Sequence, residues 1–153
     1  MNLASKVNFL LGLHVQLKIN HWQTKGVARH EAFGNTYNTL TDLIDEFVEI
    51  AMGKYGRFVL DDETNNIKLI NLSEMNPKDM ITVCTDALIE FSEDLDPRKD
   101  TDLLNLKDEM LGLLNKLQYL FTLELPLPQT FLKNFKTGFF NPVFFSYTLL
   151  ITT

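Results

Sequence analysis

Apolar residues recur at helical spacing over the first half of the chain. Over about residues 2–22 they step alternately by four and three, which draws one stripe along a helix: Leu3, Val7, Leu10, His14, Leu17 and His21. Over about residues 29–54 the same spacing gives a second stripe: Phe33, Tyr37, Leu40, Ile44, Phe47 and Ala51. Gly26 interrupts the pattern between them. We therefore predict two helices joined by a short turn.

The second half of the chain predicts two more helices. Asn76 and Pro77 form a good helix start, with Asn at the N-cap and Pro at the first helical position. The apolar face of this third helix is Met80, Val83, Ala87, Leu88, Phe91 and Leu95, and Asp96-Pro97 is expected to end it. A fourth helix is expected to begin at Asp100 or Thr101 and to stop before Pro126, with a face of Leu103, Leu106, Met110, Leu113, Leu117 and Leu120.

The links between these helices indicate the fold class. The first and last pairs have short links, whereas residues 57–72 form a long, turn-like connection between the middle two. Four amphipathic helices with one long crossover predict an all-α, ferritin-like four-helix bundle over residues 1–125.

Residues 126–153 differ from this domain in composition. They hold seven of the chain's 17 aromatic residues and no acid. A strand, a subunit-docking arm and a contact with a membrane surface are the alternatives, and docking is favoured because exposed apolar surface usually meets a partner. No segment reaches the roughly 20 continuous apolar residues of a membrane span.

Charge and cysteine content limit the partners and the compartment. Residues 1–125 hold all 20 acids against 12 Lys and Arg, and no basic arm follows, so no nucleic-acid binding is expected. The single cysteine, Cys84, suits a reducing compartment. We expect a cytoplasmic protein, or one of the host cytoplasm or the virion if it is viral.

Acidic residues gather on one face of the second helix: Asp42, Asp45, Glu46 and Glu49. Asp45 and Glu49 are one turn apart and can clasp one ion. However, this face lies roughly 140° from the apolar stripe, so in a monomer it should be solvated. The Glu-x-x-His motif of a bundle-core diiron site is also absent from the sequence.

The order of the polar groups changes this interpretation. The chain carries His21-Trp22 at the end of one helix, Lys25-Gly26 in the turn, His30 early in the next helix, and Asp45-x-x-x-Glu49 further along. This series resembles the mini-ferritins of the Dps family, and more loosely a group of small ferritin-like proteins of large DNA viruses and phages.

The resemblance implies an iron site shared between two subunits of a homo-oligomer. His21, His30, Asp45 and Glu49 would be its ligands, with Trp22 and Asp42 nearby, and manganese or zinc is an alternative to iron. The sequence departs from the family's pattern at two points, so a weakened, altered or lost metal centre is an alternative. Gly34 stands where the family usually has an acid, and the histidines are only nine residues apart. His14 has no counterpart among the family's ligands, and we expect it to be a hydrogen-bonded core or interface histidine.

Two functions follow from the sequence. The first is a mini-ferritin-like protein that binds iron and oxidises or stores it. The alternative is a non-enzymatic bundle for assembly or interaction, which keeps the fold without the chemistry.

Overall fold

A computed structural model describes residues 2–62 and 64–123 of the chain. These residues form four helices and no strand: α1 (Leu3–Gln23), α2 (Val27–Tyr55), α3 (Pro77–Glu90) and α4 (Thr101–Thr122). The predicted all-α four-helix bundle is therefore confirmed, whereas its kinship with ferritins stays a prediction. The predicted extension, residues 126–153, lies outside the described residues.

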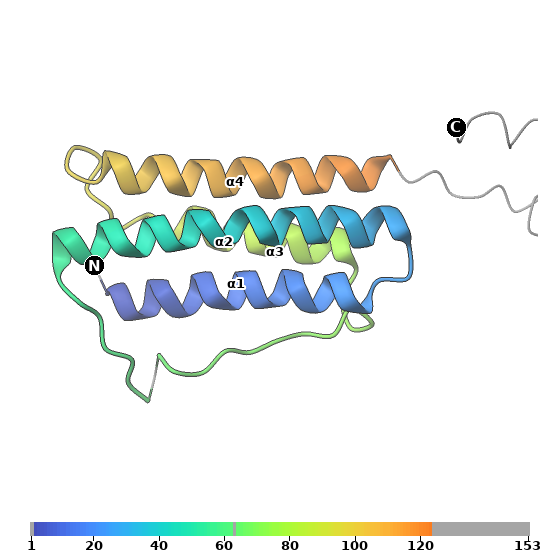
Figure 1. The fold of residues 1–153 in the computed structure, drawn as a ribbon, viewed down its shortest axis with the longest axis horizontal. Helices are drawn as coiled ribbons and strands as arrows, with labels where there is room; N and C mark the ends of the chain where they lie inside the picture. The colour runs from blue at the N-terminus through green and yellow to red at the C-terminus, as the bar shows by residue number, and fades with distance from the viewer. Residues whose placement is uncertain (1, 63, 124–153) are drawn as a thin grey trace, which may run out of the picture. The chain divides into compact units, whose positions relative to one another are not determined.

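The helices pack in the order α1, α2, α4, α3. Contacts are dense between α1 and α2, between α2 and α4, and between α3 and α4. Figure 1 shows α1 and α2 as antiparallel neighbours, with α4 running along the other side of α2. The largest fully buried side chains come from all four helices, among them Leu10, Leu17, Phe33, Phe47, Leu88, Met110 and Leu117. Burial of the apolar faces of the four helices in one common core is the main force that holds the bundle together.

The third helix ends earlier than Asp96-Pro97, so that prediction was wrong. α3 stops at Glu90, and Phe91 is its C-cap. The Phe91 ring packs against Phe9 and Phe47, with ring centroids 5.4 and 5.3 Å apart. The Lys6 ammonium donates to the Phe91 carbonyl and lies 4.3 Å from the Phe91 ring. These tertiary contacts hold the chain at Phe91, and the residues after it turn toward α4.

Several predicted core positions also differ from the structure. Val83 is 55% exposed, and Leu113 and Leu120 are only half-buried. On α4 the buried residues instead include Leu114 and Phe121. A strict 3.5-residue repeat drifts away from a 3.6-residue helix by about 20° per heptad, so the buried face moves on by one residue after Met110.

Three amide side chains of α1 attach the crossover to the bundle. Gln16 donates to the Ile70 carbonyl and accepts from the Ile70 amide, both at 2.8 Å. Asn8 donates to the Asn66 carbonyl at 3.0 Å, and Gln23 accepts from the Leu72 amide at 2.6 Å. Intervals of eight and seven residues keep these amides on one face of α1. Figure 1 shows the result, a connection that runs along the length of α1.

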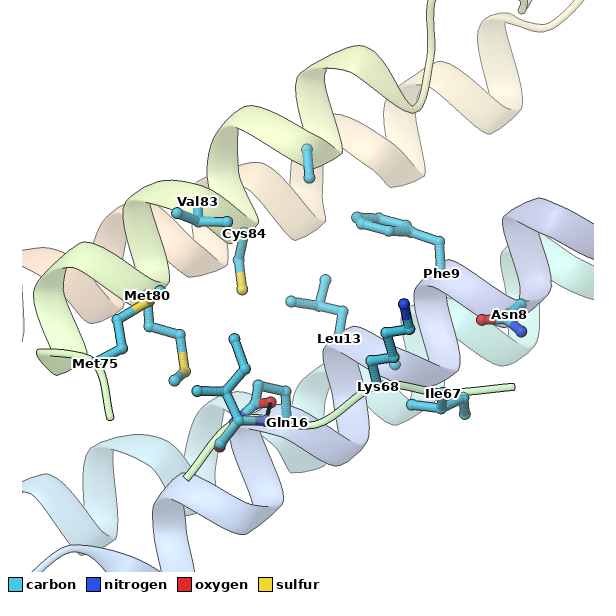
Figure 2. A pocket seen from close by; sticks show the side chains of 13 residues that line it. Asn8, Phe9, Leu13, Gln16, Ile67, Lys68, Met75, Met80, Val83 and Cys84 are labelled. Atoms are coloured by element: carbon cyan, nitrogen blue, oxygen red, sulfur yellow. Dashed lines mark hydrogen bonds between the residues drawn. The ribbon is translucent and has the colours of Figure 1, made fainter. Parts of the chain in front are cut away.

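A groove of about 270 Å³ lies between α1, α3 and the crossover. Figure 2 shows its walls, which are mostly apolar and include Phe9, Leu13, Met80 and Cys84. Within the described part of the chain, no helix is long and apolar enough to cross a membrane.

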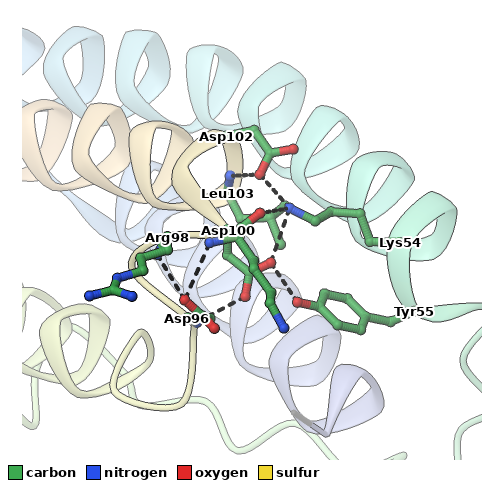
Figure 3. Close-up of polar contacts among 8 residues, drawn as sticks. Lys54, Tyr55, Asp96, Arg98, Asp100, Asp102 and Leu103 are labelled. Carbon is green, nitrogen blue, oxygen red and sulfur yellow. Dashed lines mark hydrogen bonds and ion pairs between the residues drawn. The ribbon is translucent and has the colours of Figure 1, made fainter.

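A buried carboxylate closes the end of the bundle at which α2 ends and α4 begins. Asp100 is the N-cap residue of α4, but its side chain does not cap the helix. It accepts instead from Tyr55 and Lys54 at the end of α2 and from the Asp96 amide, as Figure 3 shows. Lys54 also binds Asp102 at 2.7 Å. Desolvation alone would raise the pKa of Asp100, but these hydrogen bonds outweigh it and hold the pKa below its ordinary value.

This pKa shift predicts the response of the fold to acid. A carboxylate whose pKa is lower in the folded state stabilises the fold above its unfolded pKa of about 3.9, and this contribution is lost as the pH falls through the folded pKa. Asp100→Asn should therefore lower the melting temperature at neutral pH, and the difference from wild type should shrink below about pH 4. Asp86→Asn, at an exposed position of α3, is the charge-matched control. A difference that is constant from pH 7 to pH 3 would contradict this account.

Candidate metal centre

Two histidines meet where the short turn joins α1 to α2. His21 lies in the last turn of α1, and His30 lies in the first turn of α2. Their imidazole rings are stacked, with centroids 3.7 Å apart and planes inclined by 26°. An interval of nine residues therefore brings the two histidine rings together. The orientation of their side chains could not be predicted from the sequence.

Each histidine binds the backbone of the other. His21 Nδ1 lies 2.6 Å from the His30 carbonyl oxygen, and His30 Nδ1 lies 3.0 Å from the His21 carbonyl oxygen. A carbonyl oxygen only accepts, so both Nδ1 atoms carry the proton. In the neutral rings the nitrogen with a free lone pair is then Nε2. This is the usual state of a metal-binding histidine, whose other ring nitrogen donates to a carbonyl or carboxylate.

One of the two acceptors for this pair is a carbonyl at the end of a helix. The last carbonyls of a helix have no partner within the helix, and the His21 carbonyl lies in that final turn. The His30 ring therefore caps α1, while the His21 ring donates to the His30 carbonyl in the first turn of α2. The pair has a structural role in joining the two helices, whatever else it does.

Gly34 gives the His21 ring its place against α2. A Cβ atom built at Gly34 would lie 3.1 Å from His21 Cε1 and 3.2 Å from His21 Nδ1, which is closer than nearly all real Cβ contacts. Gly34 is buried and follows His30 by one helical turn. The His21 ring thus packs against α2 where a side chain at position 34 would begin.

Tyr37 lies beside the histidine pair. From the sequence it was placed only in the apolar stripe of the second helix, and this contact was not predicted. Its ring packs edge-on against His21 at 5.3 Å and against His14 at 5.8 Å. Thr41 donates to the Tyr37 carbonyl, so His14 Nε2 donates to the Thr41 hydroxyl at 3.0 Å. Desolvation, with a smaller contribution from Lys18, lowers the pKa of His14. His14 is hydrogen-bonded, as predicted.

The predicted carboxylate ligands lie elsewhere on α2. Asp42, Asp45 and Glu49 are all exposed, as the solvated-face interpretation predicted. Asp45 follows His30 by 15 residues, which is about 22 Å along a helix. Among residues 2–62 and 64–123, no group of three or more His, Cys, Asp or Glu side chains is placed to hold a metal ion. One chain brings the two histidines together but does not bring the acids to them.

Trp22 is on the outside of the molecule. Its side chain is 62% exposed, and the Lys18 ammonium lies 5.5 Å from its ring. The same ammonium lies 5.5 Å from the Tyr37 ring. The Lys18 ammonium is therefore shared by the Trp22 ring and the Tyr37 ring, and the latter packs against His21.

Comparison with known proteins places the chain in a family. Residues 21–121 match the model of a family of unknown function, DUF5856. The chain belongs to this family. It is also 29% identical over 104 residues to an uncharacterised 14.6 kDa protein from the mobD-ri intergenic region of Enterobacteria phage T4, covering 68% of this chain and 75% of the phage protein. No solved structure matches the chain.

These matches agree with the resemblance to phage proteins and leave the mini-ferritin part of it untested. The family match begins at His21, so the histidine turn and the acidic face of α2 both lie within it. Neither the family nor the phage protein is described by an activity.

Cys84 is the chain's one thiol, and it lines the apolar groove away from the histidine pair. Burial raises its pKa to about 11 from 9.0. Because the thiolate is the reactive form, this environment makes Cys84 a poor nucleophile. Cys84 packs here as a small, partly buried apolar residue against the core.

The raised pKa of Cys84 predicts slow thiol–disulfide exchange in the folded protein. Two pKa units lower the thiolate fraction at neutral pH by about 100-fold. Reaction with a disulfide reagent such as DTNB should be slower by this order in the folded protein than in guanidinium chloride. Cys84→Ala supplies the blank, and equal rates in the two states would refute the assigned environment.

Proposed function

We propose that this protein binds a divalent transition-metal ion, with iron(II) as the expected ion, at a site shared between two copies of the chain. His21 and His30 of one copy supply the Nε2 atoms, and Asp45 and Glu49 of the other supply carboxylates. The observation that carries this proposal is the reciprocal pair of Nδ1 hydrogen bonds, which leaves both Nε2 atoms as the available lone pairs.

The positions along α2 support a site made by two copies. His30 and Asp45 are about 22 Å apart along α2, so one ion cannot bind both the histidine pair and the acids of a single chain. Two α2 helices packed antiparallel about a two-fold axis would place each histidine pair opposite the acids of the other helix. Such a dimer has two equivalent sites.

The donor set also supports the choice of ion. Imidazole together with carboxylate suits iron, manganese or zinc better than magnesium or calcium. The net charge of −6 favours the approach of cations. In this proposal iron is the substrate, and dioxygen or peroxide would accept the electron when Fe(II) becomes Fe(III), as the mini-ferritin resemblance implies.

A second candidate is a bundle with an assembly role and no metal chemistry. One observation favours it: the histidine pair already joins α1 to α2 without any ion, through two hydrogen bonds and a stacked contact. In this case the histidines would be structural, and the acids of α2 would be a solvated face.

An anaerobic Fe(II) titration separates the two candidates. Wild type should bind iron at a roughly stoichiometric ratio near neutral pH and oxidise it when oxygen is admitted. Asp45→Ala with Glu49→Ala should weaken iron binding by tenfold or more, because two carboxylate ligands are lost. The measurement is the binding isotherm, followed by the absorbance of ferric product.

The chain offers a matched control for this double variant. Asp86 and Glu90 have the same spacing on α3 and are also exposed. Asp86→Ala with Glu90→Ala removes the same charge and should leave iron binding unchanged. No iron affinity in wild type, or equal loss in both double variants, would reject the metal site and leave the assembly candidate.

A further inference from the structure

The His21 ring lies against a residue of α2 that has no side chain. A Cβ atom at Gly34 would lie 3.1 Å from His21 Cε1 and 3.2 Å from His21 Nδ1, so the ring would have to move by a few tenths of an ångström to admit it. The backbone at Gly34 is ordinary helix, since Gly56 is the one glycine with positive φ among the described residues. The backbone conformation at position 34 therefore does not require a glycine. The space that the His21 ring needs does account for one.

We propose that Gly34 is the positioning residue of the histidine pair and decides which nitrogen of His21 is offered to a metal ion. The missing side chain lets the ring lie against α2, where Nδ1 reaches the His30 carbonyl. That hydrogen bond fixes the proton on Nδ1 and leaves Nε2 as the ligand atom. The metal part of this inference rests on the proposed function, whereas the proton position does not.

The same contact determines the donor set of one chain. An acid at position 34 would displace the His21 ring instead of adding a ligand beside it, because the space is already filled. The ligands that one chain brings together are then two imidazoles and no carboxylate, consistent with the lack of any larger ligand cluster in residues 2–62 and 64–123. This all-nitrogen half-site favours ions of intermediate softness, such as iron(II) or zinc, and disfavours magnesium and calcium.

The proton position can be measured in the full-length protein without metal. With ¹⁵N-labelled histidine, long-range ¹H–¹⁵N correlation spectra at a pH where the rings are neutral should show His21 and His30 with the proton on Nδ1. Gly34→Ala should shift His21 toward the mixture of tautomers of a free ring. Gly112→Ala is the matched control, because it is also helical and a Cβ there meets nothing within 4 Å.

A double-mutant cycle keeps the test valid if the Gly34 variant is unstable. Alanine in place of glycine normally stabilises a helix. Gly34→Ala should therefore lower the melting temperature when His21 is present and raise it in a His21→Ala background. A Gly34→Ala effect of the same sign in both backgrounds would overturn the inference.

Zinc and iron(II) titrations complete the experiment. Gly34→Ala should weaken binding of either ion by tenfold or more, while Gly112→Ala leaves it unchanged. If wild type binds neither ion but the tautomers and the cycle behave as described, the proposed function fails and the positioning role stands. If wild type binds metal and Gly34→Ala changes neither tautomer nor affinity, the positioning role fails and the proposed function stands.

Discussion

The short turn between α1 and α2 is the constraint on which the candidate site depends. Three residues join the two helices, so the helices must lie antiparallel and in contact where they meet. His21 and His30 then face each other, and each satisfies its Nδ1 proton on the backbone of the other. The space at Gly34 makes this arrangement sterically allowed. A side chain at this position would press on the His21 ring and disturb its hydrogen bond to the His30 carbonyl.

Among residues 2–62 and 64–123, the rest of the fold leaves the turn between α1 and α2 accessible. Apolar side chains from all four helices fill the centre, and the Asp100 cluster closes the opposite end. The crossover is held along α1 by amide hydrogen bonds, away from the outer face of α2. In the described part of the chain that face is uncovered, with its acids exposed and the histidine pair at its beginning. A second copy of the chain is the partner that the proposed site requires.

Local patterns were sufficient to predict the four helices, because caps, glycines and apolar spacing are properties of neighbouring residues. The apolar spacing also predicted the exposure of the acids on α2. His21 and His30 were singled out by the family resemblance, and their role as metal ligands stays a prediction. The patterns failed where distant contacts decide the outcome: Phe91 ends α3 through Lys6, and Asp100 binds α2 instead of capping α4. The role of Gly34 was missed because a glycine inside a helix gives no sign of which ring it faces; its place one turn after His30 was the available signal.

The most direct test of the shared site combines two defective chains in one oligomer. A His21→Ala/His30→Ala chain keeps the acids, and an Asp45→Ala/Glu49→Ala chain keeps the histidines. Each alone should bind Fe(II) weakly. In a co-expressed and purified hetero-oligomer, the account predicts that one intact site forms for each pair of chains, which restores tight binding at about half the wild-type stoichiometry. No recovery of binding in the hetero-oligomer would contradict a site shared between two chains.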